Sequence, residues 1–426
     1  MRILVLGAGG FIGRHIVSEL LAAGHTPVGA VRRVQDFARA FPGVEAVACD
    51  LARDISTQDW ISRLHGIDAV VNAAGLLKGP EMEAVHVTAP RALYEACAAE
   101  GVKRVVLISA ISARPDVETD YARSKLAGER LLRDGPVDWV ILRPSLIVAK
   151  GSYGGTSLLR GLAGFPVMVP VAGDGHFPFS PLAAPDLARV FRIVCEESRF
   201  SRKILEPAGP DVIPLRDLLS RTRAWLGFPP ARFFPIPLGL MTALARLGDW
   251  TGSGPISSNT LSQLIAGNAG DGKSFAAAIG FAPRSLATLM AQEPAEVQDR
   301  WHARLFFLAP ALKFILVLLW FISAIVGFFA GEELARTTLA ALGFGAEWAM
   351  PIVAATCLLD LAIAVLILRD RRGRAATLVQ LAVIAGYTMA FTLALPSLWL
   401  DPLGPLLKNL PIIAAVLCYG AVSDQR

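Results

Sequence analysis

A tyrosine and a lysine stand four residues apart, at Tyr121 and Lys125. The stretch around them has the composition of a helix, which continues through Ala127 and Glu129. Residues four apart share one helix face, so the ammonium should lie beside the phenol. Because a nearby cation favours tyrosinate, we expect Lys125 to lower the Tyr121 pKa. The pair suits proton donation or acceptance at a reacting oxygen, and a surface helix pair is the alternative interpretation.

A glycine-rich turn near the start of the chain supplies a partner for this chemistry. Arg2–Leu6 predicts a buried strand, and Phe11–Ala23 predicts a helix that Gly24 ends. Glycine between strand and helix lets the backbone approach a pyrophosphate, whose charge the N–H groups of the helix start attract. We therefore expect a bound dinucleotide and hydride transfer beside Tyr121. The predicted cofactor contacts of this turn are Gly7, Gly9, Gly10, Phe11, Ile12 and Gly13.

The second predicted strand, Thr26–Val31, is followed by Arg32 and Arg33. An acid at this place commonly holds the ribose 2′-OH of NAD, whereas guanidinium groups suit a 2′-phosphate. NADP(H) is therefore the preferred cofactor, with NAD(H) as the alternative. Two surface arginines on a solvated turn would explain the same residues.

Three more strands are predicted, alternating with helices. They are Val44–Cys49, Ala69–Asn72 and Arg104–Ile108, with a helix over about 82–100. Strands alternating with helices indicate an α/β fold, a doubly wound parallel Rossmann sheet, with the ligand at the carboxyl ends of the strands. Asp50 and Leu51 follow the third strand, where an adenine would lie.

These motifs together resemble the extended short-chain dehydrogenase/reductases, which are related to NAD-dependent epimerases and dehydratases. The series is the glycine turn, Asp50-Leu51, Asn72 to Gly75, Ser109, Tyr121/Lys125 and Arg143-Pro144. It looks closest to the atypical branch with the NADPH-carrying accessory subunit of respiratory complex I. The resemblance covers about residues 1–290 and implies a Rossmann core (1–150) and a smaller substrate lobe (151–292). It also implies that Ala73, Ala74, Gly75 and Pro144 contact the cofactor.

Two positions depart from the pattern of active relatives. Such relatives commonly carry two serines after the strand that precedes the tyrosine, and the second slot here holds Ala110. Ser109 is the provisional residue for orienting a substrate carbonyl. His86 stands where many relatives have an asparagine, and we expect it to be structural.

These departures keep two rivals open beside an oxidoreductase. One is a non-catalytic NADPH-binding assembly protein like the complex I subunit. The other is a sugar-nucleotide epimerase or dehydratase, against which the short loop between Ser109 and Tyr121 argues.

Composition narrows the class of protein further. The chain has 426 residues and a net charge of +5, which gives no reason to expect a nucleic-acid partner. Its five cysteines are scattered without a CxxC pair, so we expect reduced thiols and neither a disulfide framework nor a metal site. Met1 leads directly into the first strand, so we expect no cleavable signal peptide and a cytoplasmic first domain.

An apolar stretch interrupted by prolines occupies residues 225–247. We expect it to form the core of the substrate lobe. The alternative is a surface that rests on a bilayer or admits a greasy substrate.

The mean hydropathy of +0.50 is high for a soluble enzyme. The long apolar runs that raise it occur only after Leu305 in the sequence. After a linker (293–304), region 305–426 carries apolar runs long enough to cross a membrane. The predicted spans are Phe306–Phe329, Trp348–Leu368, Ala375–Leu395 and Leu406–Val422. Arginines at 369–374 place the second loop, both termini and the first domain in the cytoplasm, at the inner membrane of a bacterium.

This tail resembles the DoxX-like membrane domain through its span number and the stretch Pro402 to Asn409. We expect an all-α bundle of four transmembrane helices. Lys313 and Asp360 lie at similar depths, about 10 and 12 Å, and we expect them to pair, with snorkelling of Lys313 as the alternative. The tail favours membrane lipid as a partner, a lipophilic substrate such as a quinone or isoprenoid, and a place beside a respiratory or other membrane complex.

Overall fold

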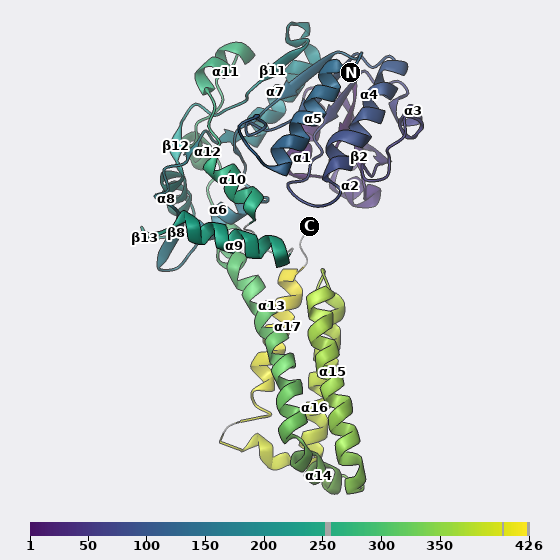
Figure 1. Cartoon of the computed structure of the whole chain (residues 1–426), viewed down its shortest axis with the longest axis vertical. Helices are drawn as coiled ribbons and strands as arrows, with labels where there is room; N and C mark the ends of the chain where they lie inside the picture. Colours follow the sequence, from purple (N-terminus) through teal and green to yellow (C-terminus); the bar gives the residue numbers. More distant parts are fainter. Residues whose placement is uncertain (252–256, 403, 424–426) are drawn as a thin grey trace. The chain divides into compact units, whose positions relative to one another are not determined.

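The computed structural model of the chain describes residues 1–251, 257–402 and 404–423 (Figure 1). The chain divides into two compact units, Met1–Ala303 and Arg304–Arg426. Each unit is described by itself below.

A seven-stranded parallel sheet forms the core of the first unit, with the strand order β11-β6-β5-β4-β1-β2-β3. At the centre, Leu6 of β1 lies opposite Ala30 of β2 on one side and Asn72 of β4 on the other. The strand order reverses there, and this reversal opens a crevice for a ligand. The predicted doubly wound parallel sheet is confirmed. The strands are β1 Arg2–Leu6, β2 Thr26–Val31, β3 Glu45–Ala48, β4 Ala69–Asn72, β5 Arg104–Ile108, β6 Trp139–Leu142 and β11 Lys203–Leu205.

Helices cover both faces of this sheet because its strands alternate their side chains between two apolar layers. In β1, Ile3 and Val5 join the layer beneath α1 and α7, whereas Leu4 and Leu6 join the layer beneath α3, α4 and α5. Figure 1 shows these helices over the sheet. Their bounds are α1 Phe11–Ala22, α2 Val34–Ala40, α3 Gln58–Leu64, α4 Ala89–Ala99, α5 Asp120–Asp134 and α7 Ala184–Glu196.

The predicted helix over 82–100 begins with a π-helical turn, Ala84–Thr88, before α4. Pro90 has no N–H to donate to the carbonyl of His86, and the Ala89 N–H bonds instead to the carbonyl of Ala84. This turn changes the direction in which His86 points.

The rest of the first unit is a small lobe built on three two-stranded sheets. These pair β7 Ile147–Val148 with β10 Leu182–Ala183, β8 Met168–Ala172 with β13 Arg232–Ile236, and β9 Pro178–Phe179 with β12 Ile213–Pro214. The lobe's helices are α6 Gly155–Ala163, α8 Leu215–Trp225, α9 Leu238–Thr251, α10 Ser258–Ile265, α11 Gly272–Ile279 and α12 Leu286–Gln292, and a 3-10 turn spans Ser198–Phe200.

The apolar stretch 225–247 divides between two environments. Leu226 and Phe228 are buried in the core of the lobe, as expected. Leu240, Leu244 and Leu247 of α9 are exposed instead. The expectation of a lobe core is therefore right for the start of the stretch and wrong for α9.

The stretch expected as a linker holds the start of α13, Val297–Ala330. Asp299, in its first turn, forms a buried ion pair with Arg160 of α6 at 2.9 Å. Arg160 also donates to the carbonyls of Ala149 and Lys150. The first residues of α13 are thereby built into the lobe.

The second unit is helical and apolar. Its elements after α13 are α14 Glu332–Ala341, a 3-10 turn Ala346–Trp348, α15 Ala349–Arg369, α16 Arg374–Ala394, a 3-10 turn Pro396–Trp399 and α17 Asn409–Ser423. Among the described residues, three helices are long and apolar enough to cross a membrane: α13, the segment Ala346–Arg369, and α16. The fourth predicted span corresponds to α17, which has 15 residues. Leu316, Ile363, Ile384 and Val416 join α13, α15, α16 and α17 in one apolar core.

The expected pairing of Lys313 with Asp360 is wrong. Lys313 Nζ donates to the carbonyl oxygen of Leu368 at 3.3 Å, near the end of α15. The buried Asp360 carboxylate accepts hydrogen bonds from Ser323 Oγ at 2.7 Å and Tyr387 OH at 3.2 Å. A long flexible lysine reaches a helix-end carbonyl, whereas a short carboxylate needs donors on the facing helices.

Candidate functional site

The glycine turn after β1 is packed too closely to admit side chains at its key positions. A Cβ on Gly13 would lie 2.1 Å from the carbonyl oxygen of Gly7, and one on Gly7 would lie 3.1 Å from that of Ala73. Gly7 also has a φ of +71°, which favours glycine. At Gly9 the nearest atom is Val31 Cγ1 at 3.7 Å, so this glycine is not sterically required by the fold.

The start of α1 offers backbone donors at this turn. No side chain caps the helix, and its first turn carries no acidic residue. The N–H of Arg14 donates the first helical hydrogen bond, to the carbonyl oxygen of Gly10. The N–H groups of Phe11, Ile12 and Gly13 precede it, at the positions where a helix offers no carbonyl acceptor of its own. A glycine cradle with an uncapped helix start fits a pyrophosphate.

Tyr121 and Lys125 lie on one face of α5, as their spacing predicted. The side chain of Thr119 caps the helix by accepting the Ala122 N–H at 3.1 Å. Lys125 Nζ lies 5.9 Å from the centre of the Tyr121 ring and donates to the carbonyl oxygen of Ile108 at 3.1 Å. It would lie 3.1 Å from a Cβ on Gly75. The structure thus brings Tyr121, Lys125 and Gly75 together at the carboxyl ends of β4 and β5.

The expected lowering of the Tyr121 pKa is not found. Burial raises the pKa of Tyr121 to about 12, because desolvation disfavours the phenolate. Burial also lowers the pKa of Lys125 to about 8, which the negative charge of Glu129 partly opposes. At neutral pH this arrangement holds a protonated phenol beside an ammonium.

Ser109 and Pro144 lie where β5 and β6 end. The Ser109 N–H donates to the carbonyl of Leu142, and the Ile111 N–H donates to that of Pro144 at 3.1 Å. The Ser109 Oγ is buried and has no hydrogen-bond partner among the residues that the structure describes. A buried hydroxyl without a partner is uncommon and fits a role toward a bound molecule.

His86 has a structural environment, in agreement with expectation. Its Nε2 accepts the Leu76 N–H at 3.1 Å, so the proton belongs on Nδ1, which lies 2.9 Å from Ser124 Oγ. Ser124 in turn donates to the carbonyl of Tyr121. Burial, together with the charge of Lys125, lowers the pKa of His86 to about 3. His86 therefore ties the segment after Gly75 to α5 as a neutral ring.

The arginines after β2 have different surroundings. Arg32 lines a hollow of about 280 Å³ together with Asp50, Arg53, Asp54 and Arg63, beside the ends of β2 and β3. Arg33 instead pairs with Asp36 at 3.2 Å. Leu51 is buried in the layer of β1 and α3. The expected cofactor contacts Arg32 and Asp50 thus share one hollow, which Arg33 does not line.

Sequence reasoning missed four charged residues at this site: Arg53, Asp54, Arg63 and Glu129. Arg53 and Arg63 join Arg32 in the hollow, and Arg63 also binds Asp54 at 2.8 Å. Glu129 lies one helical turn after Lys125 and accepts from Arg143. Glu129 could have been found from the sequence, because residues four apart on a helix lie on the same face as each other. No local sequence pattern links Arg63 to Arg32.

Comparisons with known proteins agree with this geometry. Residues 7–162 match a family described as NAD(P)H-binding, and residues 317–417 match the DoxX-like family. A ceramide reductase of Caulobacter vibrioides is 35% identical over 172 residues, which are 39% of this chain and 52% of the relative. This chain thus spans about half the length of that relative. The UPF0659 protein YMR090W of Saccharomyces cerevisiae is 32% identical over 168 residues, 36% of this chain and 73% of the relative.

Among solved structures, a short-chain dehydrogenase/reductase superfamily protein from Agrobacterium tumefaciens with bound NAD has a TM-score of 0.53 at 19% identity. The match covers 72% of this chain and 98% of that one. At this identity the likeness shows the fold alone, and the sequence matches carry the assignment. The chain joins an NAD(P)H-binding domain with a short-chain dehydrogenase/reductase-like fold to a C-terminal DoxX-like domain.

Proposed function

We propose that the protein is a membrane-anchored, NADP(H)-dependent oxidoreductase that reduces a carbonyl group. The observation that carries this proposal is the grouping of Tyr121, Lys125 and Ser109 around the ends of β4, β5 and β6. A bound nicotinamide cofactor supplies the hydride for such a reduction. The residues of the chain then have to bind the cofactor, orient the carbonyl and deliver a proton to its oxygen.

Tyr121 is proposed as the proton donor. With a pKa raised to about 12, its hydroxyl keeps its proton at neutral pH and can pass it to an oxygen that becomes negative. In the direction of reduction, this hydroxyl is the group that can supply the proton. Ser109 has a buried hydroxyl available to orient that oxygen, and Lys125 has an ammonium available for the cofactor ribose.

NADP(H) is proposed as the preferred form of the cofactor. In the hollow beside β2 and β3, Arg53 pairs with Asp50 and Arg63 with Asp54. Arg32 has no carboxylate partner among the described residues, so its guanidinium suits an additional phosphate. Among the arginines of the hollow, Arg32 is the one that directly follows β2 in the sequence. Arg33 is occupied by Asp36 and is assigned a smaller part.

A lipid-like carbonyl compound is proposed as the substrate. The relative from Caulobacter vibrioides is called a ceramide reductase, and this chain joins its reductase-like domain to membrane helices. A hydrophobic substrate held in a bilayer would then be near the domain that reduces it. An isoprenoid or quinone carbonyl fits the same argument.

Four crossings of the membrane are proposed, with both termini in the cytoplasm. α17 measures about 22 Å, short of a hydrocarbon core of about 30 Å. Its buried residues nevertheless pack in the same apolar core as those of α13, α15 and α16. This packing favours placing α17 at the same depth in the membrane as these helices. Residues before Asn409 would complete the crossing. Arg369 ends α15, Arg374 begins α16, and Arg371 and Arg372 lie between them. These four arginines favour the cytoplasmic side.

The test is NADPH oxidation by the purified full chain with a panel of lipid aldehydes and ketones. Replacing a general acid typically costs about 10²–10⁴-fold in rate, so Tyr121→Phe should lose most of the turnover and keep its NADPH affinity. Tyr419→Phe is the matched control, because it removes the same hydroxyl from α17 in the second unit. Equal turnover in the Tyr121→Phe and wild-type proteins would refute the catalytic role.

A non-catalytic NADPH-binding role is the second candidate, and Ala110 favours it because the usual second serine is missing there. NADPH that stays bound and reduced with every carbonyl offered would support this role.

A further inference from the structure

Helix α9 has a row of apolar side chains that are exposed and do not pack into the core of the lobe. Leu240, Leu244 and Leu247 follow the spacing i, i+4, i+7 and are 54%, 42% and 55% exposed. The other side of the helix carries Ala245, which is fully buried. Helices at a protein surface normally bury the apolar side and expose the polar one. α9 therefore presents a surface that needs a partner.

Neighbouring strands extend this apolar surface. In the β8–β13 pair, Met168 lies opposite Arg232 and Pro170 opposite Phe234, which places Met168 and Phe234 on one outer face. β13 leads into α9 through Pro237, and Leu238 packs over Gly173 at the end of β8. We call the following residues the α9 surface: Leu240, Leu244, Leu247, Phe234, Met168 and Val167, which are all 42% exposed or more.

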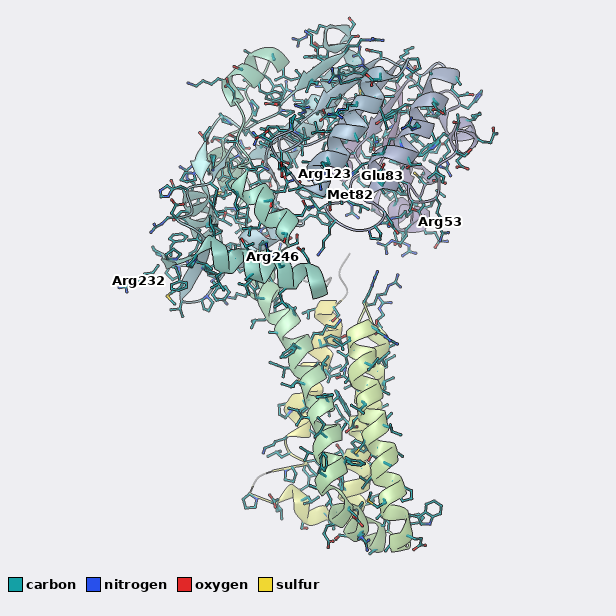
Figure 2. The ribbon with its side chains drawn as sticks, viewed as in Figure 1. Arg53, Met82, Glu83, Arg123, Arg232 and Arg246 are labelled. Atoms are coloured by element: carbon teal, nitrogen blue, oxygen red, sulfur yellow. The ribbon has the colours of Figure 1, made fainter. Side chains whose placement is uncertain are left out.

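Two exposed arginines lie on the same elements as the α9 surface. Arg246 projects from α9 and Arg232 from β13, and both are exposed (Figure 2). Apolar side chains with basic residues around them are the composition of helices that lie in the interface of a bilayer, where arginine meets anionic headgroups.

The first turns of α13 pack beside the segment that leads into the α9 surface. A Cβ on Gly164 would lie 2.9 Å from that of Ala303 in α13, so α13 passes the segment that leads to Val167 and Met168. On these first turns of α13, Val297 and Trp301 are 55% and 60% exposed. Tryptophan is enriched where a helix enters a membrane. The apolar segment of α13 follows within a few residues.

We propose that the α9 surface rests on the lipid bilayer, with its leucines at the boundary of the acyl chains and Arg232 and Arg246 among anionic headgroups. The lobe would then contact lipid directly in addition to its covalent link to α13. This proposal depends on the membrane helices and not on hydride transfer, so it stands or falls separately from the proposed reduction.

The experiment places an environment-sensitive fluorophore on the full chain at Leu244→Cys. A Cys418→Ser background is used because Cys418 is exposed and the other four cysteines are buried. The protein is reconstituted in phosphatidylcholine–phosphatidylglycerol vesicles with and without doxyl-labelled lipid. We expect a blue-shifted emission at position 244 and a loss of emission with the doxyl lipid. Retained NADPH affinity shows that the labelled chain is folded.

Leu21→Cys is the matched control, since Leu21 is a helix leucine of the same unit with 43% exposure. Its emission should be unshifted and unquenched. No quenching at position 244, or equal quenching at both positions, would overturn the proposal. A blue shift that persists in detergent and grows with protein concentration would also overturn it, because a second copy of the chain would then cover the surface.

Discussion

Lys125 Nζ donates a 3.1 Å hydrogen bond to the carbonyl oxygen of Ile108, the residue before Ser109. This bond connects α5 to the carboxyl end of β5 and so fixes the ammonium near the residues proposed to act on a substrate. Because Lys125 is buried, its charge is sensitive to pH, with a pKa lowered to about 8. The binding of nucleotide should therefore depend on pH in a range that is easy to reach.

NADPH affinity should weaken as pH rises through about 8, because Lys125 loses the ammonium proposed to bind the ribose. Fluorescence titration of NADPH between pH 6.5 and pH 9.5 measures this. Glu129 raises the Lys125 pKa, so Glu129→Gln should move the weakening to lower pH. Lys103→Gln, at an exposed lysine paired with Asp68, should leave the profile unchanged. An affinity that stays constant to pH 9.5 would contradict the role given to Lys125.

His86 should make the first unit less stable in acid. Burial lowers the pKa of His86 from its ordinary value of 6.5 to about 3 in the folded protein. Between these two pH values His86 is protonated in the unfolded chain and neutral in the folded one. Stability is lost as pH falls from 6.5 toward 3, at up to about 1.4 kcal/mol per pH unit. Unfolding midpoints of the wild type and His86→Asn, measured from pH 7 to 4.5, should diverge in slope, since an amide keeps both hydrogen-bonding groups without titrating. Parallel slopes would count against this prediction.

Gly13→Ala should cost about 1–3 kcal/mol or more, because the new Cβ would lie 2.1 Å from the Gly7 carbonyl oxygen. NADPH affinity should fall with it, since the amides of the turn must move. Gly9→Ala is the matched control and should change stability by less than about 0.5 kcal/mol, since its nearest contact is 3.7 Å away. Thermal unfolding in detergent compares the two, and equal losses would show that the steric argument is wrong.

Arg32→Ala should weaken NADPH roughly 10- to 100-fold while NADH affinity changes little, because a charged hydrogen bond to phosphate is worth about 1.5–3 kcal/mol. Arg33→Ala should have a smaller effect on both nucleotides, since Arg33 pairs with Asp36 outside the hollow. Titrations of both nucleotides against each variant measure the ratio. If Arg33→Ala changed the ratio more than Arg32→Ala, the hollow would not be the phosphate site.

The parts of the fold that local sequence determines were predictable. β1, β2, β4 and β5 have the predicted bounds, because each is a short apolar run that stops at a glycine, a charged residue or a polar residue. The glycine turn has its required neighbours. The helix over 82–100 was predicted without its π-helical turn, because Pro90 changes the hydrogen bonding of the residues before it.

Predictions that depended on packing were less successful. α9 has an apolar composition, but its composition does not say which side faces the lobe. The Tyr121 pKa was predicted from one neighbouring charge, whereas desolvation by the whole fold sets its direction. The partners of Asp360 lie on α13 and α16, far from it in sequence, so depth alone could not identify them.

The contacts of Asp360 lead to a last prediction, on coupling between helices of the second unit. Asp360→Asn and Tyr387→Phe should show a coupling energy of about 0.6–1.7 kcal/mol in a double-mutant cycle, because the phenol donates directly to the carboxylate. Asp360→Asn and Lys313→Met should be additive within about 0.5 kcal/mol, since Lys313 bonds to the Leu368 carbonyl instead. Unfolding by titration with a denaturing detergent supplies the four free energies of each cycle. A coupling with Lys313 that exceeds the one with Tyr387 would restore the ion pair, and with it a charged cross-link between α13 and α15 in place of the hydroxyl contacts.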